Sequence, residues 1–174
     1  MSDYILEIKN LYKEYTSKNI TVKAVTDISF NIKKGETVGI VGESGCGKTT
    51  LGRCIVRGIP ATSGQVLYTA EDGVTYDFLN IDKKKLKELR KDIQMIFQDP
   101  YSSLDPRMTV LNIITEPLKA NFPKMKKSEM ELRAAEIAEK VGLNPSYLKR
   151  YPHAFSDGQR QRIGIARALI INPR

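Results

Sequence analysis

The stretch GESGCGKT, Gly42 to Thr49, decides the fold of this chain. It matches the pattern G-x-x-x-x-G-K-[ST]. The apolar run TVGIVG, residues 37–42, precedes it, and KTTLGRCIVRG, residues 48–58, follows it with apolar residues at helical spacing and with Gly58 placed to end the helix. Glycines let backbone N–H groups curl toward phosphate oxygens, and the dipole of the following helix adds positive potential. The sequence therefore predicts a phosphate-binding loop between a buried strand and a helix.

The residue types of this loop indicate bound nucleotide. Lys48 is expected to reach the β- and γ-phosphates, and the Thr49 hydroxyl to ligate Mg²⁺. The predicted nucleotide contacts in the loop are Gly42, Ser44, Gly45, Cys46, Gly47, Lys48, Thr49 and Thr50. A glycine turn that only joins strand to helix is the alternative, but it leaves Lys48 unexplained. Cys46 is interpreted as a small residue that the loop tolerates, with a reactive thiol as its alternative.

Composition and charge limit the other possibilities. The chain has 174 residues, of which 41% are hydrophobic, and this is enough for one domain of ordinary size. Its net charge of +8 favours anionic partners, but the sequence has no aromatic platform or motif that would indicate nucleic-acid binding. Two cysteines without zinc spacing indicate a reduced, cytosolic protein. The longest apolar stretch, IGIARALII, is interrupted by Arg167, so we expect no membrane crossing.

The remaining first half reads as strands. Residues 4–11 and 25–32 alternate between apolar and polar, and residues 61–69 with 73–79 resemble a hairpin. The run IQMIFQ, residues 93–98, predicts a second buried strand like the one at 37–42.

The second half changes character at DPYSSLDPRMTV, residues 99–110, where two prolines favour a subdomain boundary at Asp99. Capping boxes at Ser128 with Glu131 and at Ser156 with Gln159 predict the starts of two helices. The first helix carries an apolar stripe of Met130, Ala134, Ile137 and Val141 and ends at Gly142; the second ends near residues 172–173.

Three stretches together resemble the ATP-binding subunit of an ABC transporter of the oligopeptide and dipeptide importer group, with nickel importers the nearest confusable set. They are GIVGESGCGKTTLGR, IQMIFQDPYSSLDPRMTV and YPHAFSDGQRQRIGIARALIINPR, in the family's order. The resemblance covers nearly the whole chain. It implies an α/β P-loop NTPase core with an antiparallel β subdomain in residues 1–98, and a helical subdomain with the signature motif in residues 99–174.

The resemblance also assigns roles to single residues. Tyr15 would stack on adenine, although a strand-edge aromatic is its alternative, and Gln98 would contact Mg²⁺ and the attacking water as the catalytic glutamine. Ser156, Gly158 and Gln159 would belong to the signature loop, which in this family contacts the γ-phosphate held by a partner subunit. His153, the only histidine, is interpreted as structural.

The implied cofactors are ATP and Mg²⁺. The implied partners are transmembrane permease subunits and a second ATP-binding subunit, a twin or a paralogue, at the cytoplasmic face of the cell membrane. In this family the choice of solute belongs to the membrane and binding-protein subunits.

The chain stops at Asn172-Pro173-Arg174, before the family's Walker B strand, catalytic glutamate and switch histidine. We therefore expect a fold lacking the C-terminal part of the core, in a chain that is marginally stable or self-associated alone. A fragment of a longer transport ATPase explains this; the alternative is a truncated module that binds ATP and Mg²⁺ without hydrolysing ATP, because the base that orients water is missing.

Two acidic residues also depart from the family pattern. The group commonly has Asn where this chain has Asp105, and the family signature has Gly where this chain has Asp157. A carboxylate about 5 Å from a γ-phosphate would cost roughly 3 kcal/mol at an effective dielectric near 20, and would weaken closure of the dimer about a hundredfold if it faced the nucleotide. At the first turn of its own helix, Asp157 would instead gain about 0.5 kcal/mol from the helix dipole.

Overall fold

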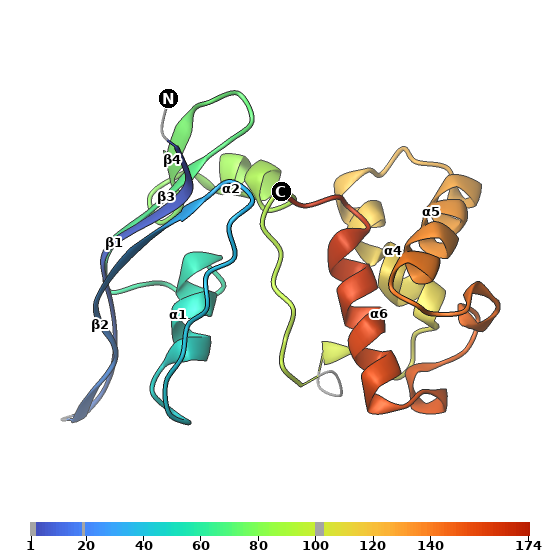
Figure 1. Ribbon diagram of the computed structural model, residues 1–174, viewed down its shortest axis with the longest axis horizontal. Helices are drawn as coiled ribbons and strands as arrows, with labels where there is room; N and C mark the ends of the chain where they lie inside the picture. The colour runs from blue at the N-terminus through green and yellow to red at the C-terminus, as the bar shows by residue number, and fades with distance from the viewer. Residues whose placement is uncertain (1–2, 19, 100–102) are drawn as a thin grey trace. The chain divides into compact units, whose positions relative to one another are not determined.

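The computed structural model describes residues 3–18, 20–99 and 103–174. The chain divides into two compact units, Met1–Arg90 and Lys91–Arg174. Both units are shown in Figure 1, coloured along the chain. The functional division at residues 98 and 99 stays a prediction.

Unit 1 is built on a four-stranded antiparallel sheet, ordered β2-β1-β3-β4. Its strands are β1 (Tyr4–Ser17), β2 (Ile20–Lys33), β3 (Ser63–Thr69) and β4 (Thr75–Asp77). The register pairs Leu6 with Tyr68 and Ile8 with Val66, which places these buried side chains on one face because side chains alternate along a strand. The predicted strands at residues 4–11 and 25–32 and the predicted hairpin are confirmed.

Two helices accompany this sheet. Helix α1 (Lys48–Ile55) lies against β1 and β2, and buries Leu51, Cys54 and Ile55 as its spacing predicted (Figure 1). It ends at Ile55 rather than at Gly58, because Arg57 takes the left-handed backbone conformation and donates to the carbonyl oxygens of Phe78 and Ile81. Helix α2 (Lys83–Leu89) begins at Asp82, whose carboxylate accepts hydrogen bonds from the N–H groups of Lys84 and Lys85.

The strands predicted at residues 37–42 and 93–98 are not formed. Both segments have irregular backbone, and most of their apolar side chains are exposed, for example 94% for Val41 and 46% for Ile96. A buried strand needs a neighbour that pairs its N–H and C=O groups. No strand among the described residues pairs with either segment, so the apolar pattern alone does not produce a strand here.

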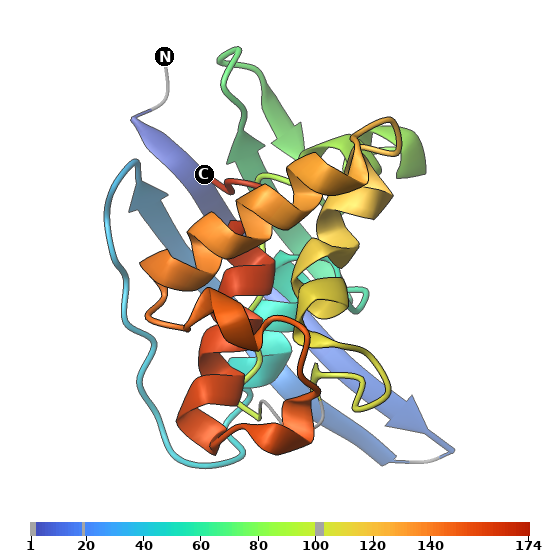
Figure 2. The same ribbon diagram turned by 90° about the vertical axis from the view of Figure 1, so that its right-hand side faces the viewer.

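In the described part of unit 2, the helices α4 (Val110–Asn121), α5 (Lys127–Lys140) and α6 (Asp157–Leu169) contact one another (Figure 2). Short 3₁₀ turns, η1 (Pro145–Tyr147) and η2 (Pro152–Ala154), join α5 to α6. The core of the unit includes Ile113, Ile114 and Leu118 of α4, Ala134 of α5, and Ile163 and Ala166 of α6. Sequence reasoning missed α4, which has Pro117 in its interior. Thr109 caps the start of this helix, because its side chain accepts a hydrogen bond from the N–H of Asn112.

The capping box predicted at Ser128 with Glu131 is wrong. Helix α5 begins at Lys127, with Lys126 as a cap that makes no side-chain hydrogen bond, so Ser128 is already helical. Glu131 pairs with Lys127, one turn earlier, at 3.8 Å. The apolar stripe does face the core, and Gly142, with φ of 75°, follows the end of the helix as expected.

The capping box at Ser156 with Gln159 is confirmed at the start of α6. Three arginines of this helix then hold three other segments of the unit through backbone carbonyl oxygens. Arg160 donates to Pro152 at 3.0 Å, Arg162 to Gly142 at 2.9 Å, and Arg167 to Ser103 at 2.7 Å. Helix α6 therefore anchors three other segments of unit 2 along its length.

Candidate functional site

The loop of residues 42–49 connects the irregular segment after β2 to the start of α1. Gly45 and Gly47 have φ of 81° and 96°, and Gly47 caps the helix in the left-handed conformation. The first intrahelical bond runs from the N–H of Leu51 to the carbonyl of Gly47, so the N–H groups of Lys48 to Thr50 precede that bond. The loop thus combines glycine-dependent curvature with the donor-rich end of a helix, the arrangement that binds phosphate.

Gly47 is required by the sheet as well as by its own backbone. A Cβ atom on Gly47 would collide with the carbonyl oxygen of Ala24 on β2. Sequence reasoning missed Ala24, because no local pattern shows which strand the loop will contact. The close approach of two backbones explains why a side chain cannot stand at this point of the loop.

The Lys48 side chain folds over its own loop. Its Nζ donates to the carbonyl oxygens of Gly42 at 2.7 Å and of Glu43 at 2.6 Å, and lies 3.5 Å from the Cys46 Sγ. The predicted loop residues Gly42, Cys46 and Lys48 are therefore brought together. The ammonium group is held at the loop's backbone by donor bonds that an incoming anion could replace.

A cavity of about 350 Å³ adjoins the loop. Its lining includes Lys23, Ala24 and Val25 of β2, Ile40 and Val41, and Lys48. The walls are largely apolar, and two ammonium groups supply positive charge. Such a hollow suits a ligand with an apolar part and an anionic part.

Tyr15 lies near the end of β1 and is half exposed. The Nζ of Lys13 lies over its ring, 4.6 Å from the centroid, since residues two apart share a face of a strand. The aromatic ring is accessible, as a stacking role requires, and Lys13 is a neighbour that sequence reasoning missed.

Gln98 and Thr49 are the two residues predicted to contact Mg²⁺. Gln98 is exposed in the irregular segment of unit 2, and Thr49 is exposed in the first turn of α1. Within the described part of the chain, no three His, Cys, Asp or Glu side chains gather as a metal-binding cluster. The roles of Thr49 and Gln98 toward Mg²⁺ stay predictions.

Ser156 and Gln159 are bonded to each other at the start of α6. The N–H of Gln159 donates to the Ser156 Oγ at 3.4 Å, and the Gln159 Oε1 accepts from the N–H of Ser156 at 3.0 Å. Ser156 and Gly158 are exposed, and Gly158 has open space around its Cα. The predicted signature residues thus form an ordered, accessible helix start.

Both acidic departures from the family pattern are paired with arginine. Asp105 lies 3.0 Å from Arg107, which holds the pKa of that carboxyl below its usual range through hydrogen bonds from its side chain and its backbone. Asp157 lies 3.3 Å from Arg160. Sequence reasoning missed the second pair, although the spacing of three residues on a helix was a signal for it.

Cys54 on α1 is fully buried, and this burial raises the pKa of its thiol. Among the described residues, no helix has both the length and the apolar character needed to cross a bilayer.

Comparisons with known proteins agree with this geometry. Residues 25–174 match the family described as ABC transporter. The chain is 53% identical, over 99% of its length, to the oligopeptide transport ATP-binding protein OppF of Bacillus subtilis, and 46% identical, over 97% of its length, to OppF of Escherichia coli. It spans 55% and 49% of those two proteins, about half the length of the curated relatives it matches.

Solved structures of similar shape are ATP-binding cassettes. The cassette MJ0796, in a dimeric post-hydrolysis state bound to ADP and phosphate, matches with a TM-score of 0.83 and 32% identity, over 97% of this chain and 70% of that one. The protein cbiO1 of Clostridium perfringens, part of the transporter complex cbiONQ, matches with a TM-score of 0.75 and 28% identity, over 99% of this chain and 63% of that one.

Proposed function

The chain belongs to the ABC transporter family, and we propose on this basis that it is the ATP-binding part of a peptide importer, coupling ATP binding and hydrolysis to uptake. The observation that carries the proposal is the glycine-rich loop at the start of α1, in which Lys48 is held at the carbonyl oxygens of Gly42 and Glu43. The names of its relatives support oligopeptides as the transported class.

The phosphate loop supplies the first set of contacts. The backbone N–H groups of the loop, from Ser44 through Cys46 to Thr50, surround the phosphates. Lys48 leaves the loop carbonyls and donates to phosphate oxygens, which exchanges neutral acceptors for charged ones and gives stronger hydrogen bonds. Tyr15 stacks on the adenine ring.

Mg²⁺ and the reaction involve two further residues. The Thr49 hydroxyl and the Gln98 amide are the proposed Mg²⁺ contacts, and Gln98 also orients the attacking water. When bound, ATP with Mg²⁺ supplies the phosphoanhydride bond whose hydrolysis drives transport. The residues of this chain bind and orient it.

The signature loop acts on a second subunit. Ser156, Gly158 and Gln159 present a helix start, with its positive dipole end, to the γ-phosphate held by a partner ATP-binding subunit. The solved MJ0796 cassette, described as dimeric, supports this arrangement. The pair of ATP-binding subunits docks on transmembrane permease subunits at the cytoplasmic face of the membrane.

Peptide uptake tests the proposal. The complete subunit, reconstituted with its permease in vesicles, should import a labelled oligopeptide when MgATP is present. Lys48→Ala should abolish uptake, whereas Lys124→Ala, which removes an equal charge from an exposed position before α5, should leave it unchanged. Undiminished uptake by the Lys48→Ala subunit would contradict the proposed function.

A further inference from the structure

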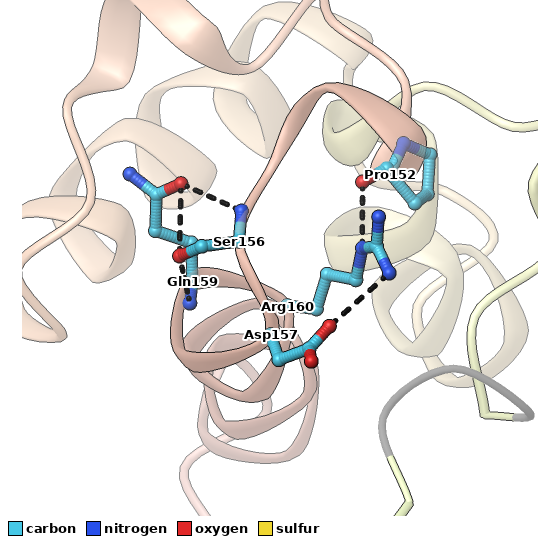
Figure 3. A network of polar contacts seen from close by, with 5 residues as sticks. All are labelled: Pro152, Ser156, Asp157, Gln159 and Arg160. Carbon is cyan, nitrogen blue, oxygen red and sulfur yellow. Dashed lines mark hydrogen bonds and ion pairs between the residues drawn. The ribbon is translucent and has the colours of Figure 1, made fainter.

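The Asp157 carboxylate turns toward its own helix. Its Oδ1 lies 3.3 Å from the Nη1 of Arg160, one turn along α6. Figure 3 shows this pair on one side of the helix start, with Ser156 and Gln159 on the other side. The carboxylate is therefore turned away from the serine hydroxyl that is proposed to meet the partner's phosphate.

Arg160 is held by contacts other than the pair. Its side chain is only 11% exposed, and its Nε donates to the carbonyl oxygen of Pro152 at 3.0 Å. Asp157, in contrast, is 86% exposed. Exposed ion pairs usually contribute little, because two mobile side chains must be ordered. Here one partner is already ordered, so only the short Asp157 side chain loses freedom.

The pair also removes net charge from the loop. A lone carboxylate at this position would repel a phosphate of the partner's nucleotide, whereas a carboxylate beside a guanidinium forms a neutral unit. Closure of a dimer would exclude water around the pair and strengthen the attraction within it.

We propose that Arg160 is a positioning residue that holds the Asp157 carboxylate against α6, and thereby keeps the signature loop able to accept the partner's nucleotide. The inference rests on the proposed function, since it concerns the same loop. This proposal replaces the expectation that Asp157 weakens closure of the dimer a hundredfold, which presumed that its carboxylate faces the nucleotide.

A double-mutant cycle tests the proposal in the complete subunit. The variants are wild type, Asp157→Gly, Arg160→Met and the double variant, and the measurement is MgATP-dependent dimerisation by sedimentation. The dimerisation constants of wild type and Asp157→Gly should agree within about threefold. Arg160→Met should weaken dimerisation tenfold or more, because it releases the carboxylate, and Asp157→Gly in the same chain should restore most of the loss. Arg133→Met, which breaks the exposed pair with Glu129 on α5, should have no effect.

Two results would overturn the proposal. If Asp157→Gly alone tightens dimerisation more than tenfold, the carboxylate faces the nucleotide despite Arg160. If the double variant dimerises as weakly as Arg160→Met, Arg160 supports dimerisation only through its hydrogen bond to Pro152.

Urea unfolding of the same four variants separates this proposal from the proposed function. The unfolding equilibrium constants should show a coupling between Asp157 and Arg160 of about twofold to fivefold. Absence of coupling would overturn the pair itself. Absence of MgATP-dependent dimerisation in wild type would count against the proposed function. The unfolding cycle would still show whether Asp157 and Arg160 interact.

Discussion

The Lys48 ammonium group lies 2.7 Å from the carbonyl oxygen of Gly42, the first residue of the same loop. The lysine thus closes a ring with the backbone that begins the loop.

Gly47→Ala should lower the free energy of unfolding by about 3 kcal/mol, because the added Cβ collides with the Ala24 carbonyl and the residue keeps a left-handed φ. Gly45→Ala is the matched control: it has a similar φ but open space around its Cα, so about 1 kcal/mol is expected. Urea unfolding followed by circular dichroism measures both. Equal losses would show that Ala24 does not constrain the loop.

Ile163→Ala should cost about 2 to 5 kcal/mol of unfolding free energy, since Ile163 is fully buried in the core of unit 2. Leu132→Ala on α5, where the side chain is 61% exposed, should change it by less than about 0.5 kcal/mol. The midpoint of denaturant unfolding reports both changes. A large loss at Leu132 would mean that this face of α5 is covered.

Arg167→Met should destabilise unit 2 by about 1 to 3 kcal/mol, because it removes the hydrogen bond to the Ser103 carbonyl from a half-buried site. Burial lowers the pKa of the Arg167 guanidinium, but its ordinary value is so high that the group stays charged at neutral pH. Arg162→Met removes bonds of the same kind from an exposed arginine and should cost less. Hydrogen exchange of the amides of α4 and α6 would locate the effect; an unchanged pattern in Arg167→Met contradicts the prediction.

Asp82 gives a pH dependence with a definite sign. The N–H groups of Lys85 and Lys84 hold the pKa of its carboxyl below the usual value, so the folded state favours the carboxylate. This contribution to stability is present above the unfolded pKa, near 3.9, and is lost as pH falls through the lower folded pKa. Asp82→Asn keeps a capping side chain without titration. The stability difference between wild type and Asp82→Asn should therefore shrink from pH 6 to pH 2. A constant difference would show that titration of Asp82 does not contribute to the pH dependence of stability.

Much of this architecture could be predicted from local patterns. The strands at residues 4–11 and 25–32, the hairpin, the helix after Gly47 and the cap at Ser156 depend on alternation, glycine and a capping box, which act over a few residues. The strands predicted for the runs TVGIVG and IQMIFQ do not form, because a buried strand needs neighbouring strands that a local pattern does not supply. The cap predicted at Ser128 fails because α5 already begins at Lys127, which places Ser128 inside the helix.

The site was predictable in its residues but not in its contacts. The spacing of Gly42 to Thr49 marks the loop, yet the close approach of Ala24 depends on how β2 meets the loop. Likewise, the sequence shows a charge at Asp157, but only the structure shows that Pro152 holds Arg160 in place to meet it.

The affinity for MgATP, measured by isothermal titration calorimetry on wild type, Lys48→Ala and Lys23→Ala, shows directly whether this chain binds nucleotide through the loop. Lys23 lines the cavity beside the loop, so its removal controls for the loss of one positive charge. We expect Lys48→Ala to weaken binding tenfold to a hundredfold, because charge-assisted hydrogen bonds to phosphate are lost, and Lys23→Ala to weaken it only a few-fold. Equal affinity of wild type and Lys48→Ala would contradict the assignment of Gly42 to Thr49 as the nucleotide-binding loop.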